Sequence, residues 1–437
     1  MREFLLVLCV TAAITYLLTG PVRKFAIVAG AMPEIRERDV HREPTPRLGG
    51  IAMFGGMCAG LLVASKLSTL SSIFSSAGGS DVPALLAGAS IMWIIGVLDD
   101  KWGVDALVKL GGQMVAAGVM VWRGLTVLWL PVPGIGAVSI PETWGTLLAV
   151  ALVVMSVNAV NFIDGLDGLA AGMVCIASVA FFVYAYRLSY GYGIPDALPA
   201  TLFSVILVGM CVGFLPHNLH PARIFMGDSG ALLLGLVLSV SMISLSGRVD
   251  PAVLAPQINT SQTEATHAMV PIYIPLLLPL TVIAIPLADL LLAVVRRTWA
   301  GKSPFAADKQ HLHHRLLEIG HSHSRAVMIM YFWAALIAFG TVAFSVGRTE
   351  ALLVKVAMTL CLIGILVLLL PRFKPHAPRM AERFLPPRYR RTAVVAQGEP
   401  PLEEAALSTQ DEELLRKIGT GAHAAGRHSG VSGRNSR

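Results

Sequence analysis

Eleven apolar segments, each close to the length of a membrane-spanning helix, constrain this chain more than any other feature of its sequence. A helix needs about 20 predominantly apolar residues to cross the hydrocarbon core of a bilayer. The segments are residues 4–19, 49–64, 83–98, 106–122, 146–160, 169–187, 201–215, 231–245, 270–295, 326–346 and 351–371. Only 14% of the residues are charged, against about a quarter in soluble domains. We therefore predict an all-α polytopic membrane protein with about eleven transmembrane helices, which excludes an ordinary soluble enzyme.

Lysine and arginine alternate between the two sides of these segments. Residues 20–48 contain six basic residues, residues 67–82 contain none, and residues 296–325 again contain six. Because positively charged loops stay in the cytoplasm, we expect the N-terminus outside and the C-terminus inside. This topology accounts for the net charge of +7, so we expect no nucleic-acid partner.

The composition of the chain changes after the last apolar segment. Residues 372–437 begin with a basic stretch, continue with an acidic stretch and end in Gly, Ser and Arg. Few apolar residues remain there to form a core. We predict a transmembrane domain over residues 1–371 and a disordered cytoplasmic tail over residues 372–437.

Carboxylate and amide side chains gather in three clusters at cytoplasmic ends of these segments. The clusters contain Asp99 and Asp100; Asn158, Asn161, Asp164 and Asp167; and Asp228. On a helix, Asn158, Asn161 and Asp164 share one face. Oxygen ligands of this kind suit a hard cation such as Mg²⁺. The structural alternatives are a solvated helix end for the aspartate pair and a helix cap for Asp228.

A fourth cluster is basic and rich in histidine. It contains Lys309, His311, His313, His314 and Arg315. Its spacing does not match a zinc motif, whereas cationic groups facing phosphates fit its basic neighbours. We interpret His321 and His323 as surface residues.

Carboxylates that hold Mg²⁺, surrounded by cationic groups, form the usual apparatus of phosphoryl transfer. Their place at a membrane boundary indicates a phosphorylated lipid as one reactant and a phosphorylated cytoplasmic molecule as the other. A transporter is the alternative of a different class. Transport sites usually lie near the bilayer midplane, whereas these clusters lie at segment ends.

Four motifs resemble the polyprenyl-phosphate N-acetylhexosamine-1-phosphate transferase family. They are Pro44-Thr-Pro-Arg-Leu-Gly-Gly, Asp99-Asp100, Asn161-Phe-Ile-Asp-Gly-Leu-Asp-Gly and Phe225-Met-Gly-Asp-Ser-Gly. The stretch from Ser303 to His314 is similar to the WecA/TagO branch, which uses UDP-N-acetylglucosamine. The alternative is the MraY branch, which uses UDP-N-acetylmuramoyl-pentapeptide.

The resemblance implies transfer of N-acetylglucosamine-1-phosphate from UDP-N-acetylglucosamine to undecaprenyl or decaprenyl phosphate. UMP is released, and the product starts a lipid-linked polysaccharide of the cell envelope. The expected place is the bacterial cytoplasmic membrane, with the active site facing the cytoplasm. The sequence leaves the oligomeric state open, with a homodimer as one option.

The resemblance also implies roles for the candidate residues. Asn161 and Asp228 would contact Mg²⁺, for which Mn²⁺ is a possible substitute, and Phe225 would stack on uracil. The expected catalytic residues are Asp99, Asp100, Asp164, Asp167, His311, His313 and His314. The other expected substrate-binding residues are Arg47, Asn158, Arg223, Lys309 and Arg315. Asp99 would position or deprotonate the lipid phosphate.

Overall fold

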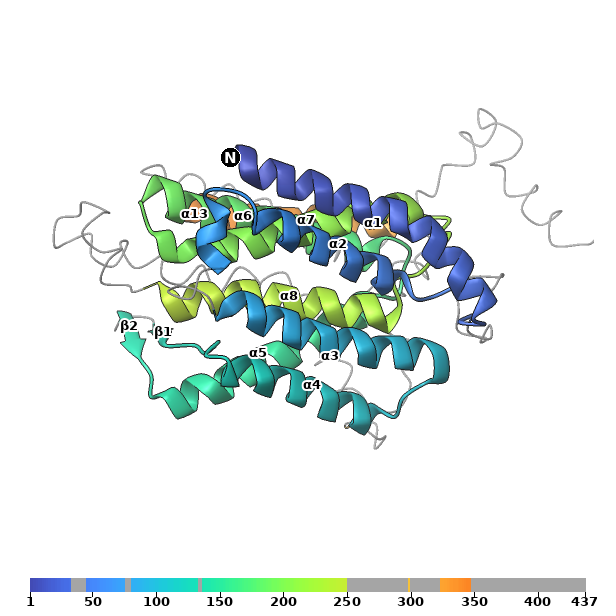
Figure 1. Cartoon of the computed structure of the whole chain (residues 1–437), viewed down its shortest axis with the longest axis horizontal. Helices are drawn as coiled ribbons and strands as arrows, with labels where there is room; N and C mark the ends of the chain where they lie inside the picture. The colour runs from blue at the N-terminus through green and yellow to red at the C-terminus, as the bar shows by residue number, and fades with distance from the viewer. Residues whose placement is uncertain (33–44, 75–79, 133–135, 250–297, 299–322, 347–437) are drawn as a thin grey trace, which may run out of the picture. The chain divides into compact units, whose positions relative to one another are not determined.

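The computed structural model describes residues 1–32, 45–74, 80–132, 136–249, 298 and 323–346 (Figure 1). All of them belong to one of two compact units in the chain, Met1–Gly364. The predicted helices 270–295 and 351–371 lie outside the described residues, as does the predicted domain boundary after residue 371.

The described residues contain nine α-helices, which coincide with the other nine predicted segments. They are α1 (Arg2–Val28), α2 (Gly49–Ala64), α3 (Asp81–Trp102), α4 (Ala106–Trp122), α5 (Glu142–Ile163), α6 (Leu169–Tyr186), α7 (Leu198–Asn218), α8 (Gly227–Arg248) and α13 (His323–Val346). Short helical turns occupy Leu70–Phe74, Arg187–Gly191 and Pro195–Ala197. Seven of the described helical segments are long and apolar enough to cross a membrane, and α2 and α4 are shorter apolar helices. The chain is therefore a multi-pass membrane protein.

Helix α8 is the centre of this arrangement. It packs against α3 and α5 on one side and against α7 and α2 on the other (Figure 1). Helix α4 joins the first group through α3 and α5. Helices α1 and α6 join the second group through α2 and α7, and α13 packs against α6. Helix α8 is apolar around its whole circumference. A central position therefore buries more of its nonpolar surface than a position at the edge of the bundle would.

Glycines bring two neighbouring helices to the backbone of α8 at its first turn. A Cβ atom on Gly96 of α3 would lie 2.5 Å from the nitrogen of Ser229 and 2.7 Å from the carbonyl carbon of Asp228. A Cβ atom on Gly50 of α2 would likewise collide with Ser229. The start of α8 is thus held within backbone contact of α2 and α3.

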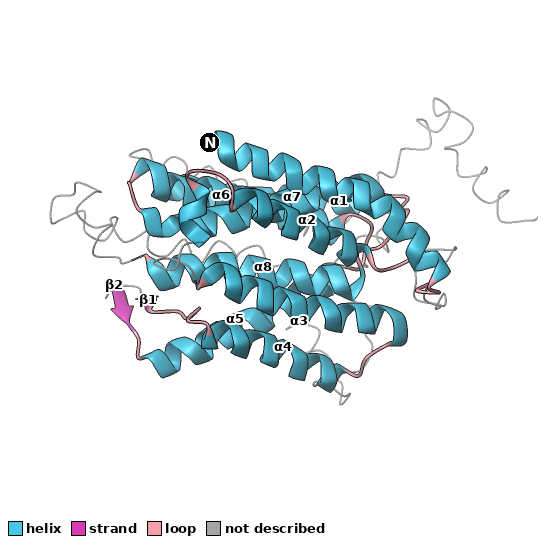
Figure 2. Ribbon diagram, viewed as in Figure 1, coloured by secondary structure: helices cyan, strands magenta, loops and turns pink. Residues whose placement is uncertain are grey.

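A small two-stranded ribbon departs from the all-α prediction (Figure 2). Strands β1 (Trp129–Val132) and β2 (Gly136–Ser139) pair antiparallel, with Trp129 opposite Ser139. The Pro-Gly-rich sequence between α4 and α5 favours a turn, and each strand is too short to be found by a search for membrane-spanning segments.

Candidate functional site

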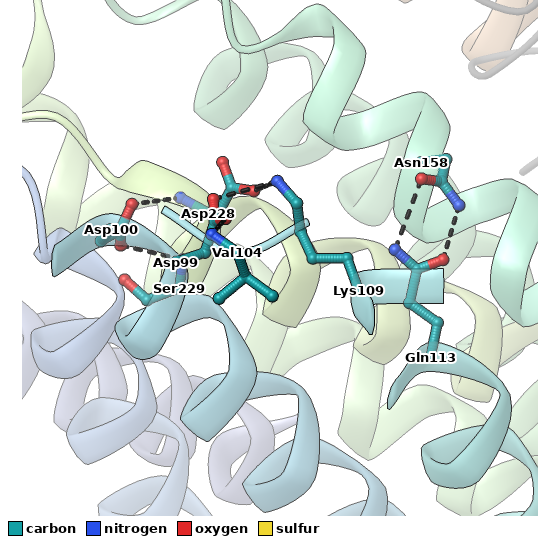
Figure 3. Close-up of polar contacts among 8 residues, drawn as sticks. All are labelled: Asp99, Asp100, Val104, Lys109, Gln113, Asn158, Asp228 and Ser229. Atoms are coloured by element: carbon teal, nitrogen blue, oxygen red, sulfur yellow. Dashed lines mark hydrogen bonds and ion pairs between the residues drawn. The ribbon is translucent and has the colours of Figure 1, made fainter. Parts of the chain in front are cut away.

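The Asp100 carboxylate caps the N-terminus of α8 from the end of α3 (Figure 3). One oxygen accepts the backbone N–H of Asp228 at 2.7 Å, and the other accepts that of Ser229 at 3.1 Å. These N–H groups have no partner within the helix, and the helix dipole favours a negative charge at this end. Gly227, at φ +68°, leaves room for the carboxylate, since a Cβ atom there would collide with it. Asp100 is only 9% exposed, so it is not a solvated helix end.

Lys109 joins the other two carboxylates of this region. Its ammonium group lies 3.0 Å from Oδ2 of Asp99 and 2.8 Å from Oδ2 of Asp228 (Figure 3). The second oxygen of Asp99 accepts the backbone N–H of Val104 at 2.7 Å. The ends of α3, α4 and α8 are therefore tied together by one cation between two carboxylates, and all three side chains keep some exposure.

The sequence interpretation missed Lys109. The signal was present, since this lysine stands inside the predicted segment 106–122, where a charged residue is costly unless it is paired or functional. The carboxylate that it contacts on α8, Asp228, is 119 residues away in the sequence. No spacing rule could therefore have supplied the pairing.

Asp164 follows the last residue of α5 and lies within the field of the same carboxylates. Enclosure by protein raises its pKa to about 7, and the charges of Asp228 and Asp100 add to the rise. Arg47 opposes it. Burial is the main cause of this rise, and the neighbouring carboxylates add to it. Asn161 lies one turn earlier on α5, and its carbonyl accepts the N–H of Asp164 at 3.3 Å.

The segments that carry Arg47 and Phe225 lie side by side. Gly49 donates its N–H to the carbonyl of Phe225 at 3.0 Å, and Phe225 donates to the carbonyl of Pro46 at 2.9 Å. Leu48, which lies between Arg47 and Gly49, adopts a φ of +85°. Arg223 belongs to the same loop as Phe225. Two motifs nearly 180 residues apart thus meet beside the start of α8.

Asp167 has a different set of neighbours from the other aspartates. Its Oδ2 atom accepts the N–H of Ala222 at 3.1 Å and lies 2.7 Å from Nδ1 of His220. The His220 ring stacks on that of His323 with centroids 4.4 Å apart. Asp167 therefore links the turn after α5 to the loop before α8 and to the start of α13.

The interpretation of His323 as a surface residue is wrong, because its side chain is 8% exposed. Helix α13 begins at this residue and packs against α6, where the hydroxyl of Tyr331 donates to the carbonyl of Gly168. His220 was not singled out from the sequence, because only the fold brings it next to Asp167.

Asn158 lies on α5 and pairs with Gln113 of α4 through their side-chain amides (Figure 3). Gln113 is a second polar residue inside a predicted segment that the sequence interpretation passed over. The basic cluster of the sequence lies outside the described residues; it comprises Lys309, His311, His313, His314 and Arg315.

The donor set of this site fits a hard divalent cation. Asp99, Asp100, Asp164 and Asp228 bring up to four negative charges together, and among the described residues Lys109 is the cation paired directly with them. Carboxylate and amide oxygens are the ligands that Mg²⁺ accepts, together with substrate phosphates. Burial and the charges of Asp228 and Asp100 disfavour the ionised form of Asp164, and a bound cation would favour it again.

Comparison with known proteins identifies relatives of the chain. A family model described as glycosyl transferase family 4 matches residues 82–246, which run from α3 to α8. Decaprenyl-phosphate N-acetylglucosaminephosphotransferase of Mycolicibacterium smegmatis is 43% identical over 379 residues, covering 85% of this chain and 90% of the relative. A probable undecaprenyl-phosphate N-acetylglucosaminyl 1-phosphate transferase of Bacillus subtilis is 32% identical, covering 86% and 93%. Phospho-N-acetylmuramoyl-pentapeptide-transferase of Moorella thermoacetica is 31% identical but covers only 54% of this chain.

Proposed function

The chain belongs to glycosyl transferase family 4, and we propose that it transfers N-acetylglucosamine-1-phosphate from UDP-N-acetylglucosamine to a polyprenyl phosphate. Decaprenyl phosphate is the acceptor proposed here, because the relative at 43% identity that spans 85% of the chain carries that name. An oxygen of the polyprenyl phosphate attacks the β-phosphorus of the nucleotide sugar, the bond to the α-phosphate oxygen breaks, and UMP leaves with the electron pair. This identity over most of both chains is the observation that carries the proposal.

The carboxylate cluster is suited to hold the cation that this reaction uses. Asn161 and Asp228 would be its protein ligands, as the resemblance implies, and Asp100 fixes Asp228 through the first turn of α8. When bound there, Mg²⁺, or Mn²⁺ in its place, would supply positive charge to the diphosphate. The residues of the chain therefore act chiefly by positioning and by charge, as is usual in phosphoryl transfer.

Lys109 gives the lipid phosphate a place to bind. An ammonium group has three N–H donors, and two of them face Asp99 and Asp228. The third has no partner among the described residues and is offered to a phosphate oxygen. Since a phosphate monoester is already largely ionised at pH 7, Asp99 acts by holding Lys109 and shaping the local charge, and a strong general base is not required.

The remaining site residues follow from the resemblance and from the loop geometry. Phe225 stacks on uracil, with Arg47 and Arg223 beside it. The basic cluster of Lys309, His311, His313, His314 and Arg315 stabilises the phosphates, and Asp167 holds the loop before α8 in place. The site faces the cytoplasm of a bacterial cell, in a cytoplasmic membrane crossed by eleven helices.

The donor is the main point on which the branches of the family differ. The pentapeptide-transferase relative aligns with little more than half of this chain, whereas the N-acetylglucosamine transferases of Mycolicibacterium smegmatis and Bacillus subtilis align with 85% and 86% of it. We therefore propose UDP-N-acetylglucosamine as the donor.

A donor panel tests the proposal. Purified protein is given Mg²⁺, decaprenyl phosphate and either UDP-N-acetylglucosamine or UDP-N-acetylmuramoyl-pentapeptide, and UMP is measured. We expect UMP only with the first donor, and only when lipid and Mg²⁺ are both present. UMP only with the pentapeptide donor would move the chain to the other branch, and none with either donor from folded protein would reject a transferase.

A further inference from the structure

We propose that Gln113 is a positioning residue that fixes the amide of Asn158 so that its oxygen faces the reactants. The oxygen then accepts a hydrogen bond from an O–H or N–H group in the site. This inference rests on the proposed transferase function, and it adds a residue to which neither the motifs nor the family resemblance assigns a role.

The two side-chain amides face each other across the contact between α4 and α5 (Figure 3). Nδ2 of Asn158 donates to Oε1 of Gln113 at 2.7 Å, and Nε2 of Gln113 donates to Oδ1 of Asn158 at 3.4 Å. Nδ2 of Asn158 also donates to the backbone carbonyl of Val154 at 2.7 Å. Asn158 is thus held by three bonds from two directions.

The carbonyl of Val154 decides which way round the Asn158 amide lies. A backbone carbonyl only accepts hydrogen bonds, so the group that meets it must be the NH₂ end of the amide. One N–H of that group is committed to Val154 and the other to Gln113. What Asn158 retains is its oxygen, which receives only the long bond from Gln113 and has a second lone pair to offer.

Burial separates the roles of the two residues. Gln113 is 2% exposed, whereas Asn158 is exposed. The other buried residues of α4 are Ala116, Ala117 and Met120, which are apolar. Gln113 is therefore the buried polar residue of α4. It orients the exposed Asn158 side chain and does not itself reach the reactants.

The pair lies close to the catalytic groups. Gln113 follows Lys109 by one turn on the same face of α4, about 6 Å along the helix, and Figure 3 shows both side chains extending from that helix. Asn158 precedes the proposed cation ligand Asn161 by three residues on α5. The side-chain oxygen of Asn158 therefore lies beside the site, about one helical turn further along α4 than Lys109 and the carboxylates that it contacts.

The chemistry of an oxygen acceptor restricts its ligand. A phosphate that is ionised at neutral pH offers acceptor oxygens, so it gains nothing from a second acceptor. The hydroxyl and acetamido groups of the sugar donate hydrogen bonds, and so does water bound to a divalent cation. Asn158 is therefore matched to the nucleotide sugar or the hydrated cation, and not to the lipid phosphate.

The test compares Gln113→Met with Gln113→Glu in UMP-release kinetics. Methionine keeps the length of the side chain and removes both amide bonds, whereas glutamate keeps an oxygen to accept from Nδ2 of Asn158. We expect Gln113→Met to raise either the KM for UDP-N-acetylglucosamine or the Mg²⁺ concentration for half-maximal rate by about fivefold or more. Which of the two rises identifies the sugar or the hydrated cation as the source of the hydrogen bond.

The KM for polyprenyl phosphate should stay within about twofold of the wild-type value. Gln113→Glu, which keeps an acceptor for Nδ2 of Asn158 but no donor for its Oδ1, should recover part of the effect. Met120→Leu, a buried apolar change on the same helix, is the matched control and should shift neither constant. A rise confined to the polyprenyl phosphate KM, or equal effects of methionine and glutamate, would overturn the proposal.

A double-mutant cycle keeps the test informative if Gln113→Met lowers stability. If Gln113 acts through Asn158, then Asn158→Ala should produce the same shift, and adding Gln113→Met to it should change the constants little further. Fully additive shifts would show that Gln113 does not act through Asn158. An inactive wild-type protein would reject the transferase function itself, so the two failures are distinguishable.

Discussion

Helix α3 carries carboxylates at both of its ends, and their surroundings differ. At its first turn, Asp81 is buried and accepts a hydrogen bond from the hydroxyl of Ser244. A similar arrangement holds Glu3 of α1, whose carboxylate accepts hydrogen bonds from Ser68, Thr69 and Leu70. These bonds come from neutral groups that join one segment to another.

At the other end of α3, Asp99 and Asp100 share their environment with two further carboxylates. Asp100 accepts two backbone N–H groups from the first turn of α8, as a structural carboxylate would. Asp99 and Asp228 instead share one ammonium group, and the pKa of Asp164 is raised to about 7. A carboxylate surrounded by neutral donors joins one segment to another. A carboxylate surrounded by other carboxylates is available for a cation.

The largest expected effect comes from removing the charge of Asp228. Asp228→Asn should lower the rate of UMP release on the order of 100- to 1000-fold, because we propose this group as a ligand of the cation where charge develops in the reaction. Steady-state kinetics at saturating substrates measure the loss. Thermal unfolding in detergent should change little, and a variant that keeps more than half of the wild-type rate would contradict the assignment.

Removing the ammonium group should have the next largest effect. Lys109→Met leaves two carboxylates at the ends of α3 and α8 without their shared cation, and breaking a partly buried pair from one side is costly. We expect a rate on the order of 100-fold lower, with Lys109→Arg recovering part of it. Equal losses in Lys109→Met and Lys109→Arg would argue against a role of the charge.

A smaller effect is expected at the cap of α8. In Asp100→Asn one oxygen can still accept an N–H, while the NH₂ group opposes the other. The stability of the fold should fall by about 1 kcal/mol, as for the loss of a helix cap, and the rate should fall about tenfold because Asp228 is displaced. Chemical unfolding and UMP release measure the two effects on the same preparation.

The dependence of cation binding on pH follows from Asp164. A carboxyl group with a pKa raised to about 7 is mostly protonated at pH 6 and mostly ionised at pH 8, and only the ionised form attracts Mg²⁺. The Mg²⁺ concentration for half-maximal rate should therefore fall up to about tenfold between pH 6 and pH 8. Asp164→Asn should flatten this dependence, and an unchanged slope in that variant would assign the titration to another group.

The smallest effect is expected at the other end of α3. Asp81→Asn keeps an oxygen that can accept from Ser244, and it lies away from the site residues on the same helix. Its rate of UMP release should stay within about twofold of the wild type, in line with the small effects of changes that spare the reacting groups. A large loss of rate with normal stability would remove the contrast between the two ends.

The helices of this protein could be predicted well from the sequence, and the contacts of the site much less. Long apolar runs predicted nine helices that the structure describes, because the bilayer demands such runs whatever the packing. The ribbon of β1 and β2 was missed, since its strands are short and carry no such signal.

The site shows where prediction from sequence stops. The motifs located Asp99, Asp100, Asp164 and Asp228, but only packing shows that Asp100 caps α8 while Asp228 faces Lys109. Gln113 and Lys109 were visible as polar residues inside the predicted segment 106–122, a pattern that indicates function. Their partners are set by helix contacts between distant segments, and no single-chain spacing rule gives those.

The most direct test of the central claim compares Asp228→Asn, Asp81→Asn and wild type in one titration of UMP release against Mg²⁺. Each protein is given UDP-N-acetylglucosamine and decaprenyl phosphate at saturating concentrations. The account predicts Mg²⁺-dependent UMP release by wild type and Asp81→Asn at similar rates, and almost none by Asp228→Asn. Equal release by all three proteins, or release that does not depend on Mg²⁺, would contradict it.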